Sequence, residues 1–155
     1  MPSQDFIIRK AKNADFLQIS ELDRVSWGNK SVNRYIPDGE HAWRLWVEYA
    51  LVFCCFDDDK IIGVSLAFPT VKNLFAVHKI FVDKSYRNNG IGTTLFEKII
   101  KEMDNSKQNS FLTVSPENDN AIKLYENMGY VFDEMVKGYY RKEEDRIVMI
   151  RRFSK

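Results

Sequence analysis

The residues whose types and spacing most clearly predict chemistry form the stretch Arg87-Asn88-Asn89-Gly90-Ile91-Gly92. This stretch joins an apolar run that ends at Val82 to an amphipathic segment that is expected to be a helix. A glycine-containing turn at such a place aims several free backbone N–H groups at one point, and the helix dipole adds partial positive charge. Glycines at 90 and 92 also let an anion approach the backbone, because they carry no Cβ. The stretch therefore predicts a binding site for a phosphorylated ligand.

Two common nucleotide-binding motifs do not match this stretch. The dinucleotide fingerprint would need a third glycine where the chain has Leu95, and a P-loop would need a Gly-Lys-Ser or Gly-Lys-Thr sequence, which does not follow. Read alone, the two glycines could also simply begin a helix. The ligand expected here is phosphorylated, but neither common nucleotide motif holds it.

The elements that must position this turn follow from the periodicity of apolar residues. The pattern favours an α/β (α+β) fold in which three central strands form an antiparallel meander. We expect strands at 6–9, 51–56, 61–68, 74–82, 111–114, 130–140 and 146–153, and helices at 15–25, 40–49, 90–103 and 121–128.

Composition indicates one globular domain, residues 1–155, and disfavours several classes of function. The 155 residues are 45% hydrophobic, which provides enough apolar surface for one core. A formal net charge of +1 leaves no basic stripe for a run of phosphates, so we expect no nucleic acid as a partner.

The cysteines and histidines predict neither a disulfide framework nor a metal site. Cys54 and Cys55 are adjacent in an apolar run, where neighbouring strand residues point to opposite faces, so we expect half-buried free thiols. The spacing of the histidines and cysteines does not fit a zinc site. No apolar stretch is long enough to span a bilayer, and residues 1–5 do not resemble a signal peptide. The sequence predicts a soluble cytoplasmic protein with no membrane partner.

Two stretches resemble the signatures of a known family, the GNAT superfamily of acyl-CoA-dependent N-acyltransferases. Arg87 to Gly92 resembles its Arg/Gln-x-x-Gly-x-Gly/Ala signature, and Asn118 to Tyr130 resembles Asn-x-x-Ala-x-x-Leu-Tyr-Glu-x-x-Gly-Phe. The resemblance is firm from Leu51 onward and rests on element order before that residue. It implies a mixed central sheet of about seven strands, largely antiparallel with a splayed parallel pair, flanked by about four helices.

The resemblance also implies acetyl-CoA as the cofactor. In relatives, backbone N–H groups hold the pyrophosphate of CoA without needing the side chain at the position of Arg87. The strand at 77–82 would run beside pantetheine, because main-chain groups of a strand edge can pair with its amides. Asn118 would lie near this arm or cap a helix, two roles that are compatible. The residues expected to bind the cofactor are Ile80, Phe81, Val82, Arg87, Asn88, Asn89, Gly90, Ile91, Gly92, Thr93, Asn118 and Tyr125.

The implied reaction is direct attack of a primary amine on acetyl-CoA in a ternary complex. A backbone N–H near Ile80 would stabilise the developing oxyanion. Tyr125 matches the tyrosine that protonates the departing thiolate in many relatives, although it could also be an ordinary aromatic residue on the apolar face of its helix. An alkylammonium ion has a pKa of about 10.4, so a base or a chain of waters must first remove a proton. His78 is the candidate base, because a relative places a catalytic histidine at what looks like the same strand position.

The resemblance also implies that the acceptor binds between the first two helices with their loop and the last hairpin. Aromatic and acidic residues there would suit a cationic small-molecule amine. Alternatively, the tryptophans belong to the core and the acids are solvated. The acceptor residues expected are Trp27, Tyr35, Asp38, Glu40, Trp43, Tyr139 and Tyr140.

Three further readings stay open. The tail from Tyr139 to Met149 resembles the ribosomal-protein alanine N-acetyltransferases, which act on a peptide amine, but those relatives carry a catalytic glutamate where this chain has Thr113. The fold could also retain the cofactor site without catalysis, as an acyl-CoA-binding domain. A homodimer is a third open point.

Overall fold

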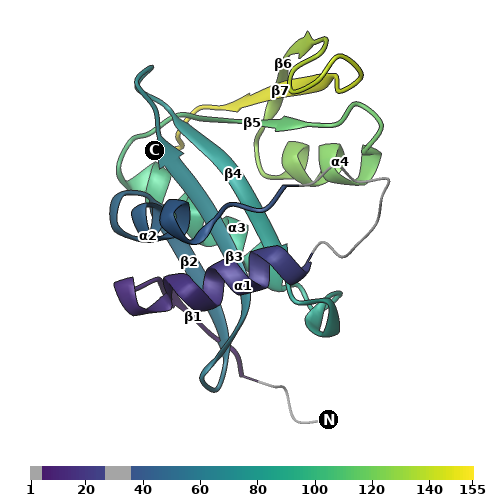
Figure 1. Ribbon diagram of the computed structural model, residues 1–155. Coiled ribbons are helices and arrows are strands. Elements are labelled where there is room, and N and C mark those ends of the chain that lie inside the picture. The colour runs from purple at the N-terminus through teal and green to yellow at the C-terminus, as the bar shows by residue number, and fades with distance from the viewer. Residues whose placement is uncertain (1–4, 27–35) are drawn as a thin grey trace. The chain divides into compact units, whose positions relative to one another are not determined.

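A computed structural model describes residues 5–26 and 36–155 of the protein, shown as a ribbon in Figure 1. The chain divides into two compact units. The first unit comprises Met1–Phe68 and Lys79–Ile100, and the second comprises Pro69–His78 and Lys101–Lys155.

Seven strands and four α-helices occur in the described part of the chain. The strands are β1 (Ile7–Lys10), β2 (Leu51–Asp57), β3 (Lys60–Pro69), β4 (Phe75–Val82), β5 (Ser110–Val114), β6 (Val131–Val136) and β7 (Arg146–Arg151). The helices are α1 (Phe16–Ser26), α2 (Glu40–Tyr49), α3 (Ile91–Asn105) and α4 (Asp119–Asn127), with short 3-10 helices η1 (Asn13–Asp15) and η2 (Lys84–Tyr86).

The strands pair in the order β1-β2-β3-β4-β5-β7-β6. The pairs β1-β2, β2-β3, β5-β7 and β6-β7 are antiparallel, whereas β4 and β5 are parallel. The parallel pairing consists of two residue pairs, Phe75 with Ser110 and Ala76 with Phe111. Within the second unit β4 and β5 pair at no further residues. The mixed, largely antiparallel sheet with a splayed parallel pair is therefore as expected.

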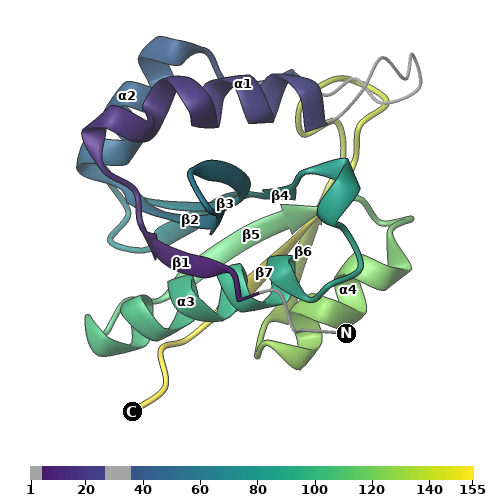
Figure 2. The ribbon, with the colours of Figure 1, turned by 90° about the horizontal axis from the view of Figure 1, so that it is seen from below.

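The core of the first unit lies between the sheet and helices α1 and α2. Figure 2 shows these helices on one face of β2 and β3 and α3 on the other. Cys54 of β2 and Val64 of β3 are opposite one another in the register and are buried with Ile19 of α1 and Trp43 of α2. On the other face, Gly63 allows close packing of α3, because an added Cβ would lie 3.0 Å from a methyl group of Leu95.

The two cysteines are free thiols, as expected, but both are fully buried rather than half-buried. The reason is that helices cover both faces of the sheet in this unit, so neither side of β2 is open to solvent. Burial raises the pKa of the Cys55 thiol to about 11, which keeps it protonated at neutral pH.

In the second unit, β5 has one buried and one half-buried face. Ser110, Leu112 and Val114 are buried, whereas Phe111 and Thr113 between them are half-buried. The expected strand at 130–140 is shorter than predicted, because β6 ends at Val136. Gly138 then adopts a φ of +62°, and its N–H donates to the carboxylate of Asp145, so the chain turns instead of extending.

Candidate active site

The turn between β4 and α3, in the first unit, presents a row of backbone N–H groups. Within the described chain, no N–H of residues 87–93 donates to a protein acceptor. Gly90 has a φ of +74°, and an added Cβ there would meet no atom within 4 Å, so the space beside the backbone is open. Since α3 begins at Ile91, its unpaired first-turn N–H groups and its dipole act on the same space. This turn fits an anion such as a pyrophosphate.

Side chains hold the turn by binding its carbonyl groups, which leaves the N–H groups available. Asn89 Nδ2 donates to the carbonyl oxygen of Tyr86 at 3.0 Å. Arg87 donates from Nε to the carbonyl of Val82 at 3.1 Å and from Nη2 to the carbonyl of Ser26 at 2.6 Å. The guanidinium of Arg87 thus connects the end of β4 with the last residue of α1.

The end of β4 packs directly against the first turn of α3. A Cβ added at Gly92 would lie 3.8 Å from Val82 Cγ2 and 3.9 Å from Ile80 Cγ2. The structure therefore brings Ile80 and Val82 of the expected cofactor set next to the glycine turn. Phe81 points the other way into the core, where its ring contacts Trp43 edge to face.

A buried lysine on β4 forms an ionic network inside the first unit. Lys79 Nζ lies 3.0 Å from Oδ2 of the fully buried Asp23 and 3.3 Å from Oδ2 of Asp38. Asp23 Oδ2 also accepts hydrogen bonds from Trp43 Nε1 and from the N–H of Asp38, each at 3.0 Å. The network joins α1, α2, the residues before α2 and β4.

Two of the residues expected on the acceptor surface, Asp38 and Trp43, lie in this network. Trp43 is fully buried, as in the alternative that places the tryptophans in the core, and Asp38 is half-buried and paired with Lys79. Glu40, at the start of α2, is exposed. Trp27 and Tyr35 lie outside the described residues.

In the second unit, α4 carries two of the expected cofactor-site residues. Asn118 caps the helix, because its Oδ1 accepts the N–H of Ala121 at 3.2 Å. The ring of Tyr125 contacts that of Tyr130 edge to face, with centroids 6.4 Å apart. Burial raises the pKa of the Tyr125 hydroxyl, while the positive charge of Arg146 acts in the opposite direction.

Arg146, the first residue of β7, holds a fixed position beside β5. Its Nε donates to Thr113 Oγ1 at 3.2 Å and its Nη2 donates to the Thr113 carbonyl at 3.0 Å. Its guanidinium carbon lies 5.6 Å from the ring centroid of Tyr140. The neighbouring Tyr139 contacts Tyr140 edge to face, and both tyrosines are exposed on the connection between β6 and β7.

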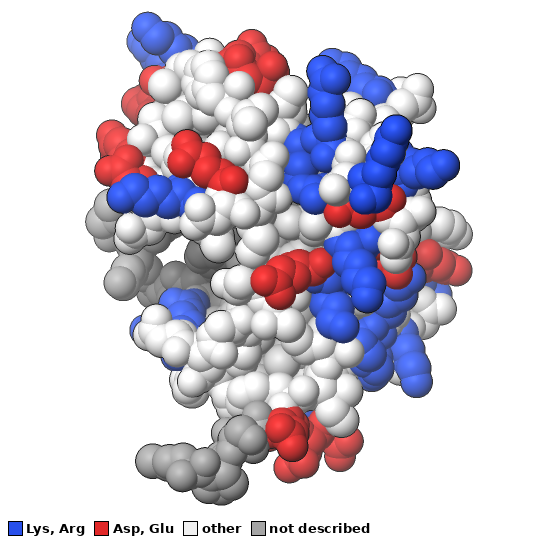
Figure 3. Space-filling view, turned by 180° about the vertical axis from the view of Figure 1, so that it is seen from behind, with Lys and Arg blue, Asp and Glu red and all other residues white. Residues whose placement is uncertain are grey.

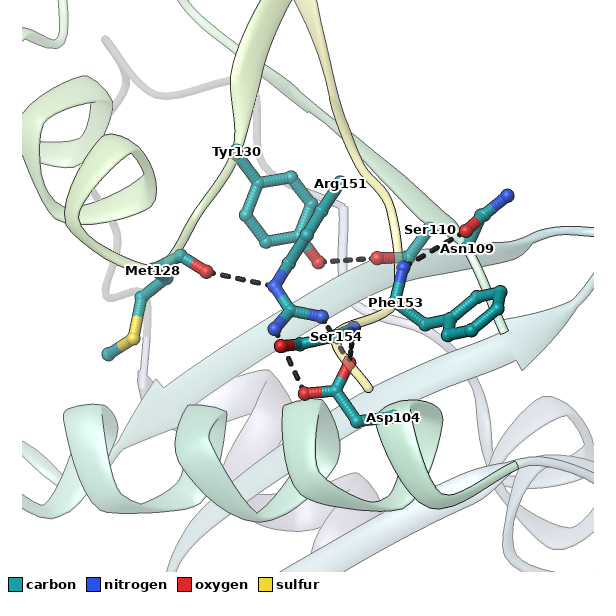
Figure 4. A network of polar contacts seen from close by, with 8 residues as sticks. All are labelled: Asp104, Asn109, Ser110, Met128, Tyr130, Arg151, Phe153 and Ser154. Carbon is teal, nitrogen blue, oxygen red and sulfur yellow. Dashed lines mark hydrogen bonds and ion pairs between the residues drawn. The ribbon is translucent and has the colours of Figure 1, made fainter. Parts of the chain in front are cut away.

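A second arginine of β7 anchors the end of α4, as Figure 4 shows. Arg151 forms a two-pronged ion pair with Asp104, at 2.7 and 3.0 Å, and donates from Nε to the carbonyl of Met128 at 2.9 Å. The hydrogen bonds from Arg151 hold the pKa of Asp104 below its usual range. Nearby, the hydroxyls of Tyr130 and Ser110 lie 2.7 Å apart and are buried. These contacts fix the helix that carries Tyr125.

The sequence analysis did not single out Lys79 or Arg146. A signal existed for Lys79, because it is a lone cation inside the apolar run from Phe75 to Val82. No comparable signal marked Arg146, which stands in a strongly charged stretch. His78 is exposed on β4, and its role as a base stays a prediction.

Comparison with known proteins identifies the family. A sequence model of the Acetyltransferase (GNAT) family matches residues 16–130. The chain belongs to the GNAT family. It is 30% identical to an N-alpha-acetyltransferase of Saccharolobus solfataricus over 162 aligned residues, which cover 96% of this chain and 93% of that protein.

Solved structures share the fold. The chain is similar to the ribosomal-protein-S18-alanine N-acetyltransferase of Escherichia coli, with a TM-score of 0.81, 22% identity and coverage of 97% of this chain and 96% of that chain. It is also similar to a chain of the NatC complex bound to Gag peptide and CoA, with a TM-score of 0.75, 21% identity and coverage of 97% and 99%.

This GNAT protein is an acetyl-CoA-dependent N-acetyltransferase. The open turn of unpaired N–H groups fits the pyrophosphate of that cofactor, so the residues present agree with the cofactor of the family. In residues 5–26 and 36–155, no group of three or more histidine, cysteine or acidic residues could hold a metal ion, and no helix could cross a membrane. On the face in Figure 3, lysine and arginine side chains gather toward one side, with a few acidic side chains among them.

Proposed function

We propose that this GNAT protein acetylates the α-amine at the N-terminus of a peptide. The likeness to an N-alpha-acetyltransferase along nearly the whole chain carries this proposal. The exposed pair Tyr139 and Tyr140 supports it, because aromatic side chains on a hairpin offer an open surface to an extended chain. Of the residues expected to suit a small cationic amine, Trp43 is fully buried and Asp38 is paired with Lys79.

The chemistry assigns a task to each of four groups. Acetyl-CoA supplies the acetyl group as a thioester. The N–H groups of residues 87–93 bind its pyrophosphate, and the N–H of Ile80 stabilises the charge that develops on the carbonyl oxygen. His78, or a water that it holds, removes a proton from the ammonium group of the acceptor. Tyr125 donates a proton to the departing sulfur, and its raised pKa keeps that proton in place at neutral pH.

The test is an acceptor panel in an assay that follows thiol release and product mass. The panel contains peptides with free α-amines, the same peptides with a blocked N-terminus and an internal lysine, and small primary amines. We expect acetylation of free peptide N-termini, a loss of about 10²- to 10⁴-fold in kcat for Tyr125→Phe and a smaller loss for His78→Ala. Turnover of small amines alone would contradict the peptide assignment. Binding of acetyl-CoA without turnover of any acceptor would indicate a non-catalytic domain.

A further inference from the structure

Among the described residues, Arg146 lacks the carboxylate partner that several other cations of this protein have. Within the described chain, no carboxylate pairs with it, and its protein contacts are those to Thr113 and Tyr140 together with its charge effect on Tyr125. The cations that do pair with carboxylates are Arg9, Arg44, Lys60, Lys79, Arg141 and Arg151.

The guanidinium of Arg146 is held in a fixed orientation, but some of its N–H donors have no acceptor within the described residues. Arginine has five N–H donors, of which Thr113 takes two through its hydroxyl and carbonyl oxygens. Three donors thus have no acceptor in the part of the chain that the structure describes. Because Nε and Nη2 are both held by Thr113 and the plane lies near the ring of Tyr140, the direction of the remaining donors is set before any ligand arrives.

The surroundings of Arg146 leave its charge uncompensated. The residue is half-buried at the start of β7, where solvent screens a charge less than it does at an exposed position. Asp145 precedes it, but its Oδ1 accepts the N–H of Gly138. A half-buried cation without a carboxylate partner favours an anionic ligand.

We propose that Arg146 binds a carboxylate on the first residue of the acceptor peptide, so that the protein prefers N-terminal aspartate or glutamate. The inference rests on the proposed peptide acetylation and names its substrate class. Arg146 lies at β7 beside the exposed tyrosines proposed to face the acceptor, and its charge reaches Tyr125, which is proposed to face the reacting thioester. A carboxylate one side chain away from the reacting amine would meet the three remaining donors.

The departing thiolate is the other anion that Arg146 could serve, and the two roles have different signatures. A contact with the acceptor carboxylate changes the ratio of kcat/KM between acidic and neutral peptides. A contact with the thiolate lowers kcat for every acceptor by the same factor and leaves that ratio unchanged.

The experiment compares peptides that are identical except for their first residue, which is Asp, Asn, Glu, Gln or Lys. We expect kcat/KM to be about tenfold or more higher for Asp than for Asn, since a charge-assisted hydrogen bond contributes about 1.5–3 kcal/mol. In Arg146→Gln this ratio should fall toward one, and in Arg146→Glu the Lys peptide should become better than the Asp peptide. Arg146→Lys should keep part of the preference, because it keeps the charge but loses the fixed direction.

Arg152→Gln is the matched control, because it removes one positive charge from an exposed position near the end of the same strand. Its Asp-to-Asn ratio should stay at the wild-type value. Circular dichroism and acetyl-CoA binding of each variant show whether it folds.

Three outcomes separate the claims. Equal rates for Asp and Asn peptides in the wild type overturn the carboxylate subsite but leave peptide acetylation standing. An unchanged ratio in folded Arg146→Gln, with a uniform loss of kcat, assigns Arg146 to the thiolate and also overturns it. No acetylation of any peptide, despite acetyl-CoA binding, refutes the proposed function and the subsite with it.

Discussion

At the scale of single residues, the chemistry of the second unit depends on how charge is distributed around Tyr125. Tyr125 is half-buried, the burial of its phenol raises the pKa, and the positive charge of Arg146 acts in the opposite direction. A proton donor needs its proton at the working pH, so the raised pKa suits the role proposed for Tyr125.

The pH dependence of kcat should therefore report on this pair. We expect activity to fall on the alkaline side when Tyr125 loses its proton, at a pH above the ordinary pKa of tyrosine. A cation favours the tyrosinate, so Arg146→Gln should move this alkaline limb to higher pH. The measurement is the pH profile of kcat with a peptide whose first residue is neutral.

The control for this profile is Arg152→Gln, in which the alkaline limb should not move. A limb that moves to lower pH in Arg146→Gln, or one that persists in Tyr125→Phe, would mean that another group controls it.

At the scale of elements, the glycine turn and α3 act as one anion site. The turn needs a positive φ at Gly90, which a residue with a Cβ adopts at a cost of about 1–2 kcal/mol. Its N–H groups are available because the side chains of Asn89 and Arg87 bind carbonyls rather than N–H groups.

Gly90→Ala should weaken the binding of acetyl-CoA by about tenfold or more, because the added Cβ strains the turn even though no atom lies within 4 Å of it. Isothermal titration calorimetry gives the dissociation constant directly. The matched control is Gly39→Ala, since Gly39 also has open space for a Cβ but has an ordinary φ of −79°. Equal weakening in both variants would refute a role for the backbone conformation at Gly90.

The elements were largely predictable from sequence, whereas the side-chain partners were not. Periodicity predicted α2 at its observed bounds, because its apolar residues repeat with helical spacing and Ala50 begins an extended run. The end of β6 at Val136 was missed, because the turn at Gly138 depends on a hydrogen bond to Asp145, seven residues away in sequence. Local patterns carry no information about such distant partners.

The same limit explains the candidate site. The glycine turn could be predicted because all of its residues are consecutive. The contacts of Asp38 and Trp43 could not be predicted, since they depend on Asp23 and Lys79, which lie 56 residues apart in the chain. Arg146 was missed for the same reason, because its partner Thr113 is 33 residues away.

At the scale of the whole molecule, three elements run from one unit into the other. β3 enters the second unit at its last residue, Pro69. β4 passes between the units at Lys79 and α3 passes between them at Lys101. The family match at residues 16–130 also includes parts of both units. We therefore expect residues 1–155 to behave as one GNAT domain in unfolding.

Thermal unfolding should show one cooperative transition. Trp43 and Trp46 belong to the described part of the first unit, so fluorescence from them reports on that unit, while hydrogen exchange of β5 and β7 amides reports on the second. Acetyl-CoA at about 100 times its dissociation constant should raise the free energy of unfolding by about 2.7 kcal/mol, as followed by either probe. Lys79→Met, which leaves Asp23 buried without its cation, should lower both midpoints together. Two separate transitions would show that the units fold independently.

The contacts of Arg87 change what its place in the signature means. Its guanidinium donates to two main-chain carbonyls, those of Val82 and Ser26. Such a place selects for a flat side chain with N–H donors rather than for positive charge, which is why a signature can allow glutamine beside arginine. Lysine keeps the charge of arginine but is a strongly hydrated point charge, so it is the less suitable replacement. A glutamine at this position in another sequence is therefore no sign of a lost cofactor.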